Sequence, residues 1–171
     1  MAYDEAIINF AVYEDGEEYL GIANVTLPTL SSVMQTISGA GISGNVEVGV
    51  AGYYDTMELT LSFRNFTRNS VKLSEPRLHN LQLCAALQTE DPTQGVVKVV
   101  PIKHLLTVFP KTDAGGTVGP ASQSNGSGTY AARVWKTYID GELVRDIDPF
   151  NYRCVINGTD YLADARAALG K

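Results

Sequence analysis

Histidine and cysteine are scarce in this chain of 171 residues, which contains two of each. Cys84 and Cys154 stand in apolar, strand-like segments without a C-x-x-C partner, so the sequence favours buried free thiols over a disulfide and predicts no metal site. His79 and His104 have no H-E-x-x-H motif and no carboxylate beside them, and the G-x-S-x-G and G-x-x-x-x-G-K motifs are absent. The sequence therefore nominates no catalytic, cofactor-binding or metal-binding residue, and we expect no enzyme.

Lysine and arginine are absent from the first 60 residues, which contain nine acidic residues. The rest of the chain contains the other ten acids and all thirteen bases, and the formal net charge of the whole is −6. A protein that reads DNA sequence usually presents a basic patch, because phosphate contacts supply most of its affinity. No basic run occurs here. The acidic first third has two interpretations. It is a surface that keeps the protein soluble, or it is a functional surface that either meets a basic partner or avoids holding DNA.

Long apolar runs are also absent, since none approaches the ~18 residues of a membrane span. The N-terminus, MAYDEAIINF, has acids where a signal peptide needs bases. We therefore expect no membrane anchor and synthesis in the cytoplasm. With 44% hydrophobic residues, residues 1–171 are expected to form a single globular domain.

Strand patterns dominate what is present. Residues 57–63 alternate between apolar and polar side chains, which indicates a half-buried antiparallel strand. Asp15-Gly16, Asp140-Gly141 and Asn157-Gly158 are each typical of a hairpin turn. The long apolar segment from Val96 to Phe109 is expected to be broken or bulged at Pro101, close to a sheet edge. The fold class predicted is mainly β, an antiparallel sandwich or barrel.

Two short helices are expected beside these strands. TRNSVKLSEP, residues 67–76, is predicted to be capped by Asn69 or Ser70 and to end near Pro76. The alanine-rich C-terminus is predicted to be helical, with Gly170 as its C-cap.

A glycine-rich stretch, SGAGISG at residues 38–44, matches the G-x-G-x-x-G spacing of a dinucleotide-binding loop. That fingerprint requires a strand before the glycines and a helix after them. Here the residues on both sides, 33–37 and 46–50, alternate with a period of two. The sequence therefore predicts a hairpin with its tip at residues 38–45, and no phosphate-binding loop.

Residues 111–128, KTDAGGTVGPASQSNGSG, form a second glycine- and serine-rich stretch, which is expected to be a long flexible loop. Asp146 and Asp148 form the neatest acidic pair, and their spacing indicates a solvated strand face or a turn more readily than a catalytic dyad. Trp135 and the nine tyrosines leave open a monomeric β-sandwich binding module of the carbohydrate or adhesion type. The mid-strand position of Trp135, however, favours packing in the core.

Three stretches together resemble the major tail tube proteins of contractile-tailed phages and related phage-tail-like bacteriocins. GIANVTLPTL resembles an early signature of that family, and SGAGISGNVEV resembles the glycine hairpin that follows it. IDGELVRDIDPFNYRCVINGTDYLADARAALG resembles the C-terminal end of the family. The resemblance covers roughly residues 18–64 and 129–170 and is looser between 76 and 128.

The resemblance implies a structural subunit without catalysis. Subunits of that family form hexameric rings that stack into a hollow tube, and each contributes strands to a continuous inner β-barrel. The implied partners are other copies of the chain, the sheath protein, and the baseplate hub, tape measure and tail terminator proteins. Double-stranded DNA would pass through the tube without specific binding if the particle is a phage. The implied location is a virion tail or phage-tail-like particle, assembled in the bacterial cytoplasm.

The resemblance also suggests roles for single residues. Acidic lumen walls repel phosphates, and Glu47 and Glu58 lie on the polar phase of their strands, so both are candidates to face the lumen. The glycine tip and the long loop are expected to contact other subunits or adjacent rings. The candidate contact residues are Gly39, Gly41, Ile42, Gly44, Gly115, Gly116, Ser124 and Asn125.

Overall fold

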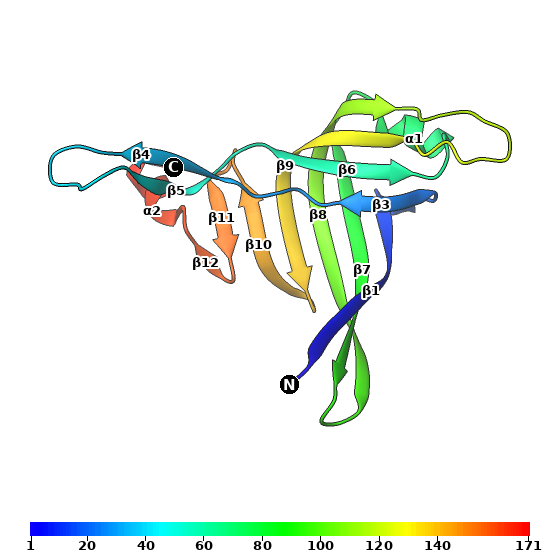
Figure 1. Ribbon diagram of the computed structural model, residues 1–171, viewed down its shortest axis with the longest axis horizontal. Helices are drawn as coiled ribbons and strands as arrows, with labels where there is room; N and C mark the ends of the chain where they lie inside the picture. The colour runs from blue at the N-terminus through cyan, green and yellow to red at the C-terminus, as the bar shows by residue number, and fades with distance from the viewer.

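A computed structural model describes residues 1–171, which form twelve strands and two short helices (Figure 1). The helices are α1 (Arg68–Leu73) and α2 (Ala163–Ala168), and neither is long and apolar enough to span a membrane. The strands are β1 (Tyr3–Glu14), β2 (Glu17–Glu18), β3 (Ile22–Thr26), β4 (Ser32–Ile37), β5 (Val46–Tyr54), β6 (Met57–Phe63), β7 (His79–Asp91), β8 (Val96–Ala114), β9 (Ser127–Ile139), β10 (Glu142–Asp148), β11 (Arg153–Ile156) and β12 (Thr159–Asp160). The mainly β fold expected from the sequence is confirmed.

Ten strands form one antiparallel sheet. Eight of them follow the order β12-β11-β10-β9-β8-β7-β1-β2, and β6 and β3 branch from it at β9. This sheet folds back on itself, because the first half of β9 pairs with β6 while its second half pairs with β10. A shift in the β8–β9 register falls between Thr107 and Val108, as expected for a bulge that bends both strands. β6 and its neighbour β3 therefore cross the main sheet at a steep angle and cover its upper part (Figure 1).

The core lies between these two layers. β6 contributes four alternating buried residues, Met57, Leu59, Leu61 and Phe63, as the sequence predicts. They pack in one cluster with residues of the main sheet, including Trp135. Each fully buried leucine contributes about 1.5–3 kcal/mol. The alternation along β6 therefore fixes which side of this strand faces the core.

The hairpin turns form where expected. Asp15, Asp140 and Asn157 all have positive φ and precede a glycine of positive φ, which is the backbone that a two-residue type I′ turn requires.

Both short helices are present, but the first begins two or three residues earlier than the predicted cap at Asn69 or Ser70 implies. Thr67 is the N-cap of α1, and Ser70 lies inside the helix. The Ser70 hydroxyl accepts a hydrogen bond from the Thr67 backbone N–H and so closes a capping box. In α2, Leu169 is the C-cap and Gly170 follows it with φ of +71°.

β8 is continuous through Pro101, so the predicted break is wrong. The expected edge is confirmed, because β9 pairs with β8 only from Ile102 upward and the Asp140 N–H donates to the Pro101 carbonyl at 2.9 Å. Below Pro101, β8 has a neighbour on one side only.

The cysteines and the long loop also differ from expectation in part. Cys154 is buried and free as predicted, whereas the free Cys84 is only half-buried. The loop is shorter than predicted, since residues 111–114 belong to β8 and residues 127–128 belong to β9.

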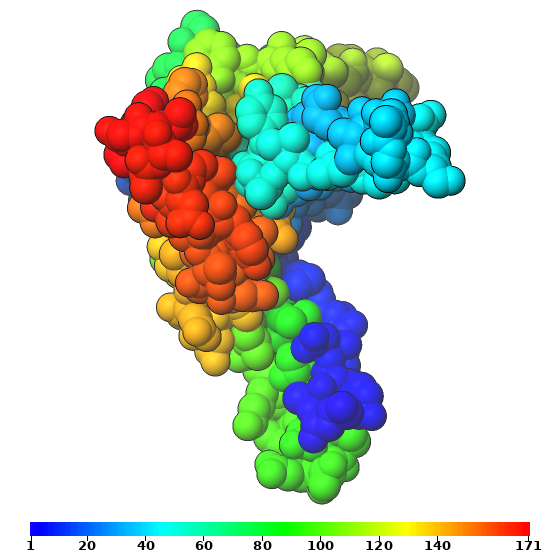
Figure 2. Space-filling view, turned by 90° about the vertical axis from the view of Figure 1, so that its left-hand side faces the viewer, coloured from blue at the N-terminus to red at the C-terminus, as the bar shows by residue number.

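Two β structures project from the body of the molecule. The first, called the hairpin here, is β4 and β5, which pair only with each other. The second, called the arm, consists of residues 3–9 of β1, 86–91 of β7 and 96–101 of β8. Figure 2 shows the hairpin in cyan and the arm in blue and green, separated by open space. No second layer of this chain covers the arm or the part of the hairpin near its tip (Figures 1 and 2).

Candidate assembly surfaces

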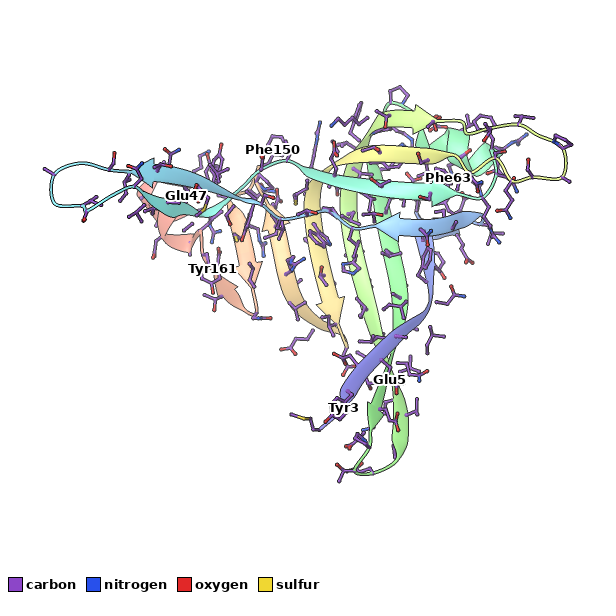
Figure 3. The ribbon with its side chains drawn as sticks, in the orientation of Figure 1. Tyr3, Glu5, Glu47, Phe63, Phe150 and Tyr161 are labelled. Carbon is purple, nitrogen blue, oxygen red and sulfur yellow. The ribbon has the colours of Figure 1, made fainter.

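The hairpin carries an uncovered aliphatic face. The register pairs Ile37 with Val46 and Gln35 with Val48, so these residues share one face. Ile37, Val46 and Val48 are all more than 40% exposed. Glu47, which pairs with Thr36, lies on the opposite face (Figure 3). Apolar side chains in this number on an uncovered strand pair mark an interaction surface.

The base of the hairpin is anchored to the C-terminal part of the chain. Gly52 has φ of +70°, and a Cβ added to it would lie 2.6 Å from Cγ of Leu162. Only glycine allows β5 to lie this close to the residue that precedes α2. The base of the hairpin is therefore held in place, and this sets the direction in which the hairpin projects.

The tip at residues 38–45 is a turn between two strands, as predicted, and no helix follows it. A backbone hydrogen bond from Ile42 N–H to the Gly39 carbonyl, at 3.1 Å, closes the turn. Gly39, Gly41 and Gly44 all have positive φ. The geometry that a dinucleotide fingerprint needs is absent from this stretch.

The second glycine-rich segment, residues 115–126, is held at its base by the chain itself. The Thr117 N–H donates to the Ser124 carbonyl at 2.9 Å, and the Asn125 N–H donates to the Arg64 carbonyl at 3.1 Å. The Ser124 N–H donates to Oδ1 of Asn65. Gly115, Gly116, Ser124 and Asn125 thus lie at the base of this loop, whereas Val118, which is 99% exposed, lies further out.

The arm exposes apolar side chains on both of its faces. Tyr3, Ile7, Ile8, Val97 and Val99 are between 50% and 58% exposed. A three-stranded sheet without a covering layer has little stability by itself. The arm is therefore a second surface that suits association.

Glu47 and Glu58, the two candidate lumen acids, are not brought together by the fold. Glu47 lies on the hairpin, and no ion pair within the chain involves it. Glu58 lies on the polar face of β6 and forms an ion pair with Lys111 of β8. The charge of Glu58 is thus already balanced within the chain.

A buried ionic cluster joins the end of β1 to the segment that follows α1. Oε1 of Glu14 lies 2.8 Å from both Nδ1 of His79 and a guanidinium nitrogen of Arg77. Oε2 accepts from the Tyr19 hydroxyl. The second ring nitrogen of His79 lies 3.0 Å from the Glu75 carbonyl. Both ring nitrogens of His79 thus lie within hydrogen-bond distance of an oxygen atom.

The cluster also sets the acidity of its members. Burial raises the pKa of the Glu14 carboxyl, but hydrogen bonds from Tyr19, Arg77 and His79 outweigh burial, and the pKa of Glu14 is lowered overall. Burial and the hydrogen bond to Glu14 raise the pKa of Tyr19. The carboxylate partner of His79 was not evident from the sequence, because Glu14 is 65 residues away.

The second histidine lies within the core beside Trp135. The Trp135 Nε1–H donates to Nδ1 of His104 at 3.2 Å, and the Thr137 hydroxyl lies 3.0 Å from the same nitrogen. Burial lowers the pKa of His104, and the charge of Arg145 adds to this effect. Trp135 is 4% exposed, so it is a core residue and offers no platform for a sugar ring.

Asp146 and Asp148 lie on one face of β10 but are buried, so the expected solvated face is wrong. Oδ2 of Asp146 pairs with Arg153 at 2.9 Å, while its Oδ1 has no hydrogen-bond partner. Asp148 instead accepts from the side chain and backbone N–H of Asn151. The two carboxylates thus have separate structural partners.

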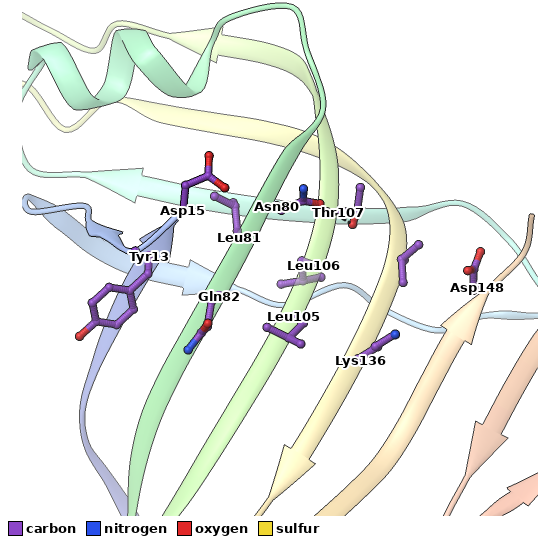
Figure 4. Close-up of a pocket in the computed structure, with 12 residues that line it drawn as sticks. Tyr13, Asp15, Asn80, Leu81, Gln82, Leu105, Leu106, Thr107, Lys136 and Asp148 are labelled. Carbon is purple, nitrogen blue, oxygen red and sulfur yellow. Dashed lines mark hydrogen bonds between the residues drawn. The ribbon is translucent and has the colours of Figure 1, made fainter. Parts of the chain in front are cut away.

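A depression of about 520 Å³ lies on the polar face of the main sheet (Figure 4). Tyr13, Gln82, Leu105 and Lys136 stand side by side across four strands on this face. The side-chain hydrogen bond among its lining residues joins the Thr107 hydroxyl to Oδ1 of Asn80. The depression is thus a polar surface of the sheet that brings no catalytic pair together.

The chain is similar to proteins of contractile particles. A sequence model of the family described as phage tail tube protein FII matches residues 4–170. Two solved structures share the fold, both titled as parts of an extracellular contractile injection system, PVC. The sheath/tube terminator in the extended state has 12% identity and a TM-score of 0.54, over 80% of this chain and 97% of that chain. The sheath-tube complex in the extended state has 14% identity and a TM-score of 0.52, over 75% of this chain and 87% of that chain. No curated protein sequence matches the chain.

Proposed function

Because this chain belongs to the phage tail tube protein FII family, we propose that its copies form hexameric rings that stack into the hollow tube of a contractile particle. The chain is a structural tail tube subunit. The observation that carries the ring-and-stack proposal is the pair of uncovered β projections, the hairpin and the arm. Each exposes aliphatic side chains that no other part of the same chain covers, so both are suited to burial against further copies.

The hairpin tip and the loop at residues 115–126 are the proposed contacts with neighbouring subunits or rings. The tip projects furthest from the body on one side of the molecule and the loop on the other (Figure 1). Because the four predicted residues of the loop hydrogen-bond or pack at its base, we assign the contact itself to the outer residues of the loop, around Val118. At the tip, Ile42 is the proposed apolar contact, with Gly39, Gly41 and Gly44 shaping the turn.

The proposed partners follow from the two solved relatives, which are described as a sheath/tube terminator and a sheath-tube complex. We infer a sheath around the tube and a terminator at its end. A baseplate hub, a tape measure protein and, in a phage, transiting DNA complete the proposal. The particle would be assembled in the bacterial cytoplasm, and the subunit would act without catalysis.

A lumen that transmits DNA must not bind phosphate, and an unbalanced acidic side chain serves that need. Of the two candidates, Glu58 is paired with Lys111, so Glu47 contributes more net negative charge. We therefore propose Glu47 as the stronger lumen candidate. The binding-module alternative has lost its main support, because Trp135 is buried.

The test is direct visualisation of the purified protein. Negative-stain electron microscopy, with the mass in solution measured alongside, is expected to show rings or hollow tubes. A variant with Val48→Glu on the aliphatic face of the hairpin provides a folded control that should not assemble. A wild-type protein that stays monomeric even after addition of its baseplate hub would overturn the proposal.

A further inference from the structure

The arm has two free backbone edges. β1 is hydrogen-bonded to β7 on one side, and on its other side β2 reaches only Tyr13 and Glu14. β8 is bonded to β7 over its whole lower part, but β9 stops at the level of Ile102. Residues 3–9 of β1 (the β1 edge) and 96–100 of β8 (the β8 edge) therefore present unpaired N–H and C=O groups, which are a template for another strand.

The two edges run in the same direction. β1 is antiparallel to β7, and β7 is antiparallel to β8, so β1 and β8 are parallel to each other. When copies of the arm are related by rotation about a ring axis, each strand keeps its direction relative to that axis. The rotation brings the β8 edge of one copy beside the β1 edge of the next as a parallel pair, and a head-to-tail contact of this kind closes into a ring.

The charges of the two edges are opposite. The β1 edge contains Asp4 and Glu5 and no base, while the β8 edge contains Lys98 and no acid. Figure 3 labels Tyr3 and Glu5 on the β1 edge. Asp4 and Lys98 are both exposed, and neither belongs to any of the ion pairs within the chain. Two β1 edges would set acids against acids, and two β8 edges would set lysine against lysine, so charge favours the mixed pair.

Register places the opposite charges at one level. Asp4 pairs with Thr89, and Thr89 pairs with Lys98, so all three side chains project from the same face of the arm at the same height. Within one chain, β7 separates Asp4 from Lys98. In a continued sheet the Lys98 of one copy becomes the direct neighbour of the Asp4 of the next.

We propose that the β8 edge of one copy pairs in parallel with the β1 edge of a second copy, with Lys98 beside Asp4. Val97 and Val99 then lie against the β1 edge and lose exposed surface. This proposal rests on the proposed self-assembly of the chain, and it specifies which strands join neighbouring subunits.

A charge swap tests it. The variants are Lys98→Glu, Asp4→Lys and the double variant with both changes, and all have exposed side chains, so the fold should be retained and is checked by circular dichroism. The readout is the lowest protein concentration at which rings or tubes sediment. Each single variant is expected to raise that concentration about tenfold, because attraction becomes repulsion at every contact. The double variant is expected to return close to the wild-type value.

Lys103→Glu is the matched control, since it makes the same charge change on a part of β8 that β9 already pairs. It should leave the assembly concentration unchanged. Two results would contradict the edge pairing while leaving the proposed tube function intact, provided that wild-type protein forms rings. In the first, the double variant needs as high a protein concentration to assemble as the single variant that assembles least readily. In the second, Lys103→Glu raises the assembly concentration as much as Lys98→Glu does. If wild-type protein forms no rings even after addition of its baseplate hub, the proposed function itself fails.

Discussion

Nδ1 of His79 lies 2.8 Å from Oε1 of Glu14, and both side chains are almost completely buried. Replacing Glu14 with glutamine would remove the negative charge that Arg77 pairs with and would replace the carboxylate oxygen beside the buried His79 ring with a neutral amide group. Leaving a buried polar group without its hydrogen-bond partner costs about 1–3 kcal/mol. Urea unfolding of Glu14→Gln should show this loss, whereas Glu17→Gln, at an exposed ion pair with Lys72, should unfold like wild type. Equal midpoints for the two variants would mean that the cluster contributes nothing to the stability of the fold.

The same cluster predicts how stability depends on pH. The pKa of Glu14 is lowered in the folded chain, mainly by its three hydrogen bonds working against burial. Its contribution is therefore fully present above the unfolded glutamate pKa of about 4.3 and is lost as pH falls through the lower folded pKa. The difference in free energy of unfolding between wild type and Glu14→Gln should be constant from neutral pH down to about 5 and shrink below about 4. A difference that stayed constant down to the acid end would contradict this role of Glu14.

The parts of the fold that follow from local chemistry could be predicted from the sequence. Alternation along β6 gives its buried face, and Asp140-Gly141 gives a turn, because neighbouring residues carry all the information. The hairpin tip could be separated from a phosphate loop for the same reason. The capping error at α1 is also local. Ser70 is a good cap by type, but Thr67 has the extended backbone that an N-cap needs, and this depends on how the chain enters the helix.

The parts that depend on distant residues could not be predicted. Glu14 meets His79 only because β1 and β7 are neighbours in the sheet. Asp146 and Asp148 are spaced like a solvated pair, and their partners Arg153 and Asn151 are near in sequence, but the burial of both carboxylates depends on where β10 lies in the sheet. The free edges of the arm likewise depend on where β9 ends and where β2 begins. The sequence of one segment does not determine how far a neighbouring strand extends beside it.

Gly116 at the base of the loop at residues 115–126 leaves no room for a side chain. Gly116 has φ of +79°, and a Cβ there would lie 2.0 Å from the Ser124 carbonyl oxygen. Gly116→Ala should therefore break the Thr117–Ser124 hydrogen bond and destabilise the chain by about 1–3 kcal/mol. Gly119→Ala is the control, because that position has ordinary φ and meets only the flexible Ser122 hydroxyl, at 3.0 Å. Thermal unfolding compares the two, and amide exchange at Thr117 reports the lost bond directly. Equal exchange in both variants would show that the base of the loop tolerates a side chain.

The last prediction concerns the hairpin. One of its faces is aliphatic and the other carries Glu47, while both are exposed to solvent. Val48→Glu puts a charge on the aliphatic face, where assembly would have to bury it without a partner. Thr36→Glu adds the same charge on the opposite face, beside Glu47. Since no other layer of the chain covers this part of the hairpin, both variants should unfold within about 0.5 kcal/mol of wild type. Only Val48→Glu should prevent rings or tubes in electron micrographs. If both variants assemble, the aliphatic face stays exposed to solvent in the tube. If neither variant assembles, added charge blocks assembly on either face of the hairpin, and the assignment of one buried face is wrong.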